Sequence, residues 1–106
     1  MPHHPIAELP KPGQERSYDR RTGIQRILGL LVGKTNSIQW IAIQCSAGNL
    51  AGRVENPQVV KNNDGYSVVG QTTATPGQSS EFRFYDNGLM PAGQELVTIS
   101  SIFVKC

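Results

Sequence analysis

The residues that most constrain the fold of this chain are the tight-turn residues between its short apolar runs. The clearest example is "NNDG", residues 62–65, which separates the β-prone runs "PQVVK" and "YSVVGQTTA". Asn, Asp and Gly accept the positive φ angles of a two-residue hairpin turn more readily than other residues do. The sequence therefore predicts an antiparallel β-hairpin centred on residues 62–65.

Strand signals also precede this hairpin. The stretch "SIQWIAIQC", residues 37–45, has apolar side chains in both phases of a two-residue period, which predicts a central strand covered on both faces. Residues 50–60 make a further run that Pro57 interrupts. A proline within a strand is typical of an edge strand or a bend.

Two more strand signals follow the hairpin. "SSEFRFYDNG", residues 79–88, places Phe82 and Phe84 on the same face of a strand and ends in another turn at Asn87 and Gly88. "QELVTISSIFVKC", residues 94–106, changes the phase of its apolar residues at the serine pair 100–101. Such a phase change predicts a β-bulge or a sharp bend.

Together with an apolar run at residues 24–32, these signals amount to about six strands joined by short connections. This spacing predicts an all-β fold, either a small antiparallel β-barrel or a β-sandwich. The composition agrees, because 11 Gly, 7 Pro and only 17% charged residues are typical of short strands joined by tight turns. A chain of 106 residues has room for one such domain.

The stretch "RRTGIQRILGLLVGKTNS", residues 20–37, fits two secondary structures. Its apolar residues match the helical i, i+3, i+4, i+7 template at Ile24, Ile27, Leu28 and Leu31. They match one face of a strand at Ile24, Leu28, Leu30 and Val32. Gly23 and Gly29 would each cost a helix about 1 kcal/mol relative to alanine. The sequence therefore favours a strand at residues 23–33.

Residues 1–22 are predicted to form an extended arm ahead of a single β domain at residues 23–106. Four prolines fall in the first twelve residues, and apolar periodicity is weak there. Residues 1–34 carry six basic and three acidic side chains, so this part is mildly basic beside a nearly neutral remainder. The sequence shows no signal peptide and no apolar run near the ~20 residues that span a bilayer. We expect a soluble protein, and nothing indicates its location.

Residues suited to catalysis are scarce in the predicted β domain. Both histidines, His3 and His4, lie in the arm, so a Ser or Cys nucleophile in the body has no histidine base near it in sequence. A zinc site normally needs three or four ligands, and Cys45 and Cys106 are the only other soft donors. We therefore expect no enzyme activity, no metal site and no cofactor. The two cysteines are compatible either with one disulfide bridge or with two free thiols.

The best candidates for a binding site are the basic residues at the junction between arm and body. "RSYDR" spaces Arg16 and Arg20 four residues apart, with Arg21 beside them. Arg26 follows in the apolar run, and Tyr18 is an aromatic side chain that the predicted core does not require. Because guanidinium groups bind phosphate in bidentate fashion, these residues predict contact with a negatively charged ligand or partner.

The spacing in "RSYDR" resembles the Arg-x-x-x-Arg arm of PilZ domains, which are small β-barrels that bind a cyclic dinucleotide with such arginines. The resemblance covers five residues. That family also carries Asp/Asn-x-Ser-x-x-Gly on a following strand, and "QCSAGN", residues 44–49, departs from this pattern at its first and last positions. The resemblance implies a cyclic dinucleotide held by Arg16 and Arg20.

These observations give two hypotheses for function. The first is a non-enzymatic structural or assembly protein that docks on neighbouring subunits or a partner through its arm, as a decoration, coat or connector protein of a virion would. The alternative is a small β-barrel that binds single-stranded nucleic acid or a cyclic dinucleotide with the junction arginines. We expect a protein partner or self-association rather than a membrane, because inserting residues 20–33 into lipid as an amphipathic helix would remove the apolar run "ILGLLV" from the core.

Overall fold

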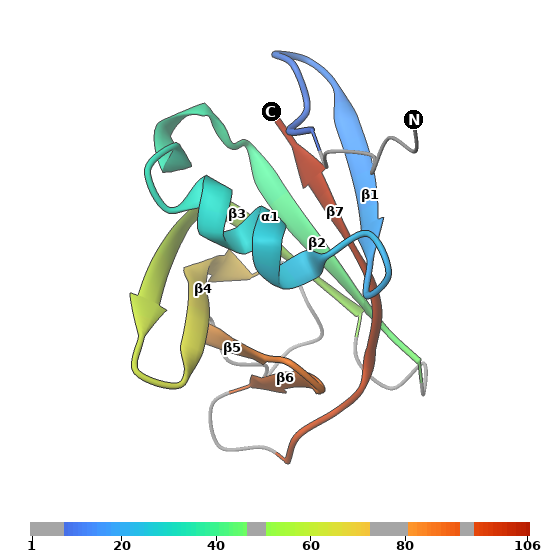
Figure 1. Ribbon diagram of the computed structural model, residues 1–106. Helices are drawn as coiled ribbons and strands as arrows, with labels where there is room; N and C mark the ends of the chain where they lie inside the picture. Colours follow the sequence, from blue (N-terminus) through green and yellow to red (C-terminus); the bar gives the residue numbers. More distant parts are fainter. Residues whose placement is uncertain (1–7, 47–50, 73–80, 92–94) are drawn as a thin grey trace, which may run out of the picture.

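Strands dominate the structure, a computed structural model that describes residues 8–46, 51–72, 81–91 and 95–106 (Figure 1). The elements in chain order are β1 (Glu15–Asp19), α1 (Ile24–Leu31), the 3-10 helix η1 (Thr35–Ser37), β2 (Trp40–Cys45), β3 (Ala51–Asn62), β4 (Gly65–Thr72), β5 (Glu81–Tyr85), β6 (Gly88–Pro91) and β7 (Ile99–Lys105). Among these residues, no helix is long and apolar enough to cross a membrane.

All seven described strands lie in one antiparallel sheet with the order β1-β7-β2-β3-β4-β5-β6. The last strand of the chain, β7, therefore lies between β1 and β2. Beyond β6, a single bridge follows, in which Leu89 and Val97 exchange two backbone hydrogen bonds of 2.9 Å. This bridge does not close the sheet into a barrel. The predicted all-β class is confirmed, as one open sheet.

The hydrophobic core lies between α1 and the sheet. Figure 1 shows α1 lying across one face of the sheet, where it contacts β1, β3 and β4. The largest fully buried side chains are Ile27, Leu28, Leu31, Ile41, Ile43, Val54, Val68, Phe82, Phe84, Leu89, Ile102 and Val104. Phe82 and Phe84 share the inner face of β5, as the alternation at residues 79–88 predicted.

The hairpin predicted at residues 62–65 is confirmed. Asn62 pairs with Gly65, so two residues form the loop between β3 and β4. Gly65 has a φ of 146°, and a Cβ atom there would lie 2.3 Å from the carbonyl oxygen of Phe84 on β5. Glycine is therefore required at this position both by backbone conformation and by the close approach of β5.

The bend predicted at Pro57 is present in β3. The pairing of β3 with β4 changes register between Glu55 and Gln58, and Asn56 has a positive φ of 48°. The strand lies between β2 and β4, so the proline marks a bend in an internal strand rather than an edge.

The irregularity predicted at the serine pair 100–101 is also confirmed. Opposite β7, Gln44 pairs with Ser101 while the next residue, Cys45, pairs with Ile99. Ser100 is therefore the extra residue of a β-bulge, and it moves the apolar residues of β7 from one alternation phase to the other.

The strand favoured for residues 23–33 is wrong, because residues 24–31 form α1. The four residues of the helical template are all buried: Ile24, Ile27, Leu28 and Leu31. Burying each of these side chains contributes about 1.5–3 kcal/mol, which together exceeds the helix penalty of glycine. Gly23 stands outside the helix as its N-cap, and a Cβ atom on Gly29 would lie 2.9 Å from the hydroxyl of Tyr66.

Part of the segment expected as an arm belongs to the sheet. Residues 15–19 form β1, which pairs with β7 along its length, and Tyr18 is buried in the core. Before β1, Pro10 is buried, and the N–H of Gly13 donates a 2.8 Å hydrogen bond to the carbonyl of Cys106. The buried ring of Tyr18 gives this segment an apolar anchor that its polar composition does not reveal. Residues 1–7 of the predicted arm lie outside the described residues.

Candidate functional site

A tight turn between β1 and α1 carries two of the candidate arginines. The carboxylate Oδ1 of Asp19 accepts a 2.8 Å hydrogen bond from the N–H of Thr22, and the Thr22 hydroxyl accepts a 2.7 Å bond from the N–H of Asp19. The Thr22 hydroxyl also donates to this carboxylate oxygen at 3.1 Å, and the bond from the Thr22 N–H, followed by this one, holds the pKa of Asp19 below its usual range. Arg20 and Arg21 occupy the two positions between these bonded residues, so the turn fixes the backbone positions from which both side chains extend.

Next to this turn is an open cleft of about 480 Å³. Arg20 and Arg21 line it on the β1–α1 side, and Tyr85 and Asp86 line it from the turn between β5 and β6. Ile24 at the start of α1 and Ile99 at the start of β7 also line it, but both belong to the buried core, so the accessible aromatic surface of the cleft is that of the half-buried Tyr85.

Two hydrogen bonds hold the sides of the cleft together. The side-chain amide of Gln25 donates to the carbonyl of Tyr85 at 3.0 Å. The guanidinium of Arg20 donates to the carbonyl of Asp86 at 3.4 Å. Both acceptors are backbone atoms, so the carboxylate of Asp86 is not used in these contacts.

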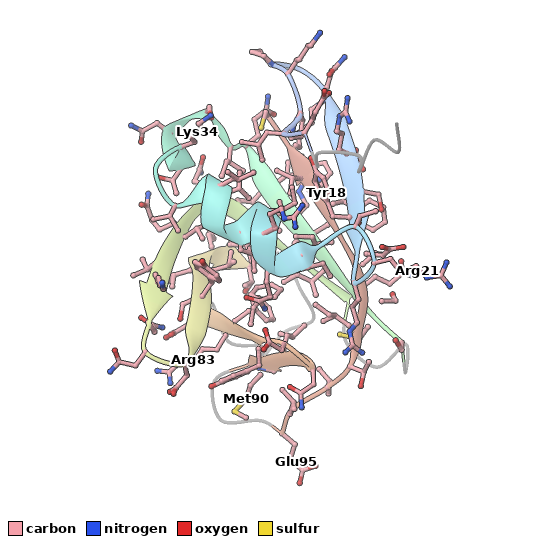
Figure 2. The ribbon with its side chains drawn as sticks, in the orientation of Figure 1. Tyr18, Arg21, Lys34, Arg83, Met90 and Glu95 are labelled. Carbon is pink, nitrogen blue, oxygen red and sulfur yellow. The ribbon has the colours of Figure 1, made fainter. Side chains whose placement is uncertain are left out.

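The charge at the rim of the cleft is mainly positive. Figure 2 shows the side chain of Arg21 projecting from the loop between β1 and α1 away from the body of the protein. The cleft lies at the N-terminal end of α1, where Gly23 provides no side-chain cap for the first N–H groups of the helix. These N–H groups and the helix dipole add a partial positive charge to the two guanidinium groups.

The other sequence candidates do not line the cleft. Arg16 lies on β1 and pairs with the carboxylate of Glu8 at 3.4 Å. Tyr18 is only 4% exposed, and its hydroxyl donates to the backbone carbonyl of Glu8. Burial also raises the pKa of Tyr18, so this side chain serves the core and not an exposed binding surface. Arg26 is exposed on α1, but it is not a lining residue of the cleft.

Sequence reasoning missed the far side of the cleft. Tyr85 and Asp86 are about sixty residues from the arginines, and their Asn-Gly turn gives a sufficient local reason for an aspartate. In the sequence, Ile99 is one apolar residue of an alternating strand pattern, and nothing distinguishes it as a site residue. No local signal could have joined these positions to Arg20, because only the pairing of distant strands brings them together.

The disulfide considered for Cys45 and Cys106 does not form. Both cysteines are free, and burial raises the pKa of each thiol. In the β2–β7 ladder, Trp40 pairs with Lys105 at one end and Cys45 with Ile99 at the other. The cysteines therefore lie at opposite ends of the ladder, about 20 Å apart at the rise of a strand. A disulfide needs Cα atoms within about 7 Å.

In the part of the chain that the structure describes, no group of three or more His, Cys, Asp or Glu residues is placed to hold a metal ion. The histidines His3 and His4 lie outside that part.

Comparison with known proteins found no matching family model, no matching curated protein and no matching solved structure. The five-residue resemblance to PilZ domains gains no support from the geometry either. Arg16 is paired with Glu8 on β1, and of the two arginines only Arg20 reaches the cleft. Residues 47–49 of "QCSAGN" lie outside the described residues.

Proposed function

We propose that the protein is a non-enzymatic binding module whose contact site is the cleft between the β1–α1 loop and the β5–β6 turn, where it holds a negatively charged group. The observation that supports this most directly is that Arg20 and Arg21, adjacent in the sequence, both line the same open cleft. Of the five residues that the sequence singled out, these are the two that the fold places beside a space large enough for a ligand.

The arginines suit this role because of their chemistry. A guanidinium group is always charged and presents a planar fork of donors that matches phosphate or carboxylate oxygens. Hydrogen bonds between charged partners are about twice as strong as neutral ones. The reciprocal bonds between Asp19 and Thr22 restrict the turn, so less ordering is needed when a ligand binds.

The assembly hypothesis is compatible with this site but is not required by it. An acidic patch on a neighbouring subunit could enter the same cleft. Docking through the arm predicted at residues 1–22 stays a prediction, and residues 1–7 of that arm lie outside the described residues. Sedimentation velocity on the full chain and on a chain without residues 1–7 will test it.

We expect the double substitution Arg20→Ala, Arg21→Ala to weaken anion binding by at least about tenfold, because it removes two charge-assisted interactions. The measurement is an NMR titration of the ¹⁵N-labelled protein with inorganic phosphate, following the backbone amides of residues 23–25 and 86. Lys34→Ala is the matched control, since Lys34 is an exposed cation at the opposite end of α1 (Figure 2).

The expected result is a saturable shift of these amides that is lost in the double variant and kept in Lys34→Ala. Because Lys34→Ala removes one charge and the double variant removes two, a loss of binding free energy in Lys34→Ala about half that in the double variant would mean that phosphate senses only the net charge of the protein. Absence of any saturable shift at these amides in the wild type would also reject the proposal.

A further inference from the structure

The cleft is much larger than a simple anion requires. Its volume of about 480 Å³ falls in the range of sites that bury small organic ligands, roughly 300–1,000 Å³. An inorganic phosphate bound at Arg20 and Arg21 would not contact the half-buried side chain of Tyr85 on the other side of the cleft. The size of the cleft and this aromatic side chain together indicate a ligand with an anionic group and an apolar part.

The cleft also contains one group that a plain anion would avoid. Asp86 is exposed, and it lines the cleft opposite the arginines. Its carboxylate repels an anion, yet it accepts hydrogen bonds from hydroxyl or amino groups. A ligand that fits the arginines, Asp86 and the apolar surface of the cleft carries an anionic end, hydrogen-bond donors and an apolar face. An alkyl phosphate lacks the donors, and a free sugar phosphate lacks the apolar face.

We propose that the cleft binds a nucleotide unit, with its phosphate at Arg20 and Arg21, the donors of its sugar or base at Asp86, and its flat ring against Tyr85. This inference rests on the proposed function, since it names the ligand of the same site. A free mononucleotide and one nucleotide of a single strand present the same chemistry to these residues. Stacking and apolar contact with the ring add affinity that phosphate alone does not have.

The test compares three ligands in the same NMR titration: inorganic phosphate, adenosine and adenosine monophosphate. We expect the monophosphate to bind at least about tenfold more tightly than either of its two halves, because it uses both ends of the cleft. A short oligothymidylate forms a fourth arm. Tighter binding of the oligonucleotide identifies a nucleotide within a strand, and tighter binding of the monophosphate identifies a free nucleotide; both results support the inference.

The variant Asp86→Ala tests the orientation of the ligand. It should weaken binding of the monophosphate while leaving inorganic phosphate unchanged or more tightly bound, because removal of a carboxylate also removes repulsion. Asp64→Ala is the matched control, since Asp64 is an exposed aspartate in the other two-residue turn and does not line the cleft.

Three outcomes overturn the inference: a monophosphate that binds no more tightly than phosphate, adenosine that binds as tightly as the monophosphate, or an Asp86→Ala variant that weakens both anions equally. In the first case, phosphate binding that still depends on Arg20 and Arg21 keeps the proposed function while the nucleotide assignment fails. If none of the ligands depends on these arginines, both proposals fail.

Discussion

Tyr18 shows how the role of a single residue depends on its surroundings. In the sequence, it lies between two arginines and has the character of a binding residue. In the structure, its ring is in the core and its hydroxyl donates to the carbonyl of Glu8, which fastens the segment before β1 to the sheet. Arg20 lies only two positions further along, yet it reaches a turn and an open cleft. The two roles differ because β1 ends at Asp19, so Tyr18 lies in the strand while Arg20 lies in the turn that follows it.

The buried hydroxyl of Tyr18 makes stability depend on pH in the alkaline range. Burial raises the pKa of Tyr18, so above the ordinary tyrosine value of about 10 the native state holds a proton that the unfolded state releases. The contribution of Tyr18 to the free energy of unfolding is therefore fully present below pH ~10, and it decreases as the pH rises toward the higher native pKa. Urea denaturation across this range will measure the slope.

Tyr18→Phe serves as the comparison for this pH dependence. It should cost about 1 kcal/mol at neutral pH, because the hydrogen bond to Glu8 is lost. It should also flatten the alkaline decrease, since no hydroxyl remains to titrate. A variant whose decrease above pH ~10 matches that of the wild type would show that other groups cause it.

At the scale of elements, α1 shows why local patterns can mislead. Gly29 in its interior opposes a helix in isolation, and a strand pattern is present in the same residues. The helix forms because its apolar stripe meets the sheet, and Gly29 gives room for the hydroxyl of Tyr66 on β4. The competing strand would place only alternate residues on the core face. Tertiary burial therefore outweighs intrinsic propensity in this segment.

Gly88 is an element-scale position where a small change should destabilise the fold. It begins β6 beside the bridge of Leu89 and Val97, and a Cβ atom there would lie 2.3 Å from the carbonyl oxygen of Val97. Gly88→Ala must push these backbones apart, and we expect a loss of about 1–3 kcal/mol in the free energy of unfolding.

Gly33→Ala is the control for Gly88→Ala, because no atom lies within 4 Å of a Cβ atom at Gly33. It should change stability by less than about 0.5 kcal/mol. Chemical denaturation of the three proteins gives the comparison. Equal stability of Gly88→Ala and the wild type would show that β6 and the segment before β7 can separate freely.

At the scale of the whole molecule, the sheet order determines the chemistry of the cysteines. Cys45 and Cys106 lie at opposite ends of the β2–β7 ladder, so they cannot bridge within one folded chain. We expect alkylation with iodoacetamide under native conditions to be slow, because burial raises the pKa of both thiols and the thiolate is the reactive form.

The same reagent should add two groups per chain when the protein is unfolded without a reductant, as measured by intact mass. Under native conditions, Cys45 should react more slowly than Cys106, since Cys45 is buried and Cys106 is half-buried. If the unfolded chain reacted with iodoacetamide only after a reductant was added, the cysteines would be disulfide-bonded, which would contradict the free-thiol assignment.

The sequence by itself determined the features that depend on neighbouring residues. The turns at residues 62–65 and 85–88, the bend at Pro57, the bulge at Ser100 and the inward face of β5 all follow from local conformational preference and two-residue alternation. It also pointed to Arg20 and Arg21, because adjacent charges are visible without a fold. Only the tertiary structure decided that residues 24–31 are helical, that β7 lies beside β1, and that Tyr85, Asp86 and Ile99 complete a cleft with those arginines. Each of these depends on burial against segments far along the chain, and local sequence does not encode which distant segment supplies that contact.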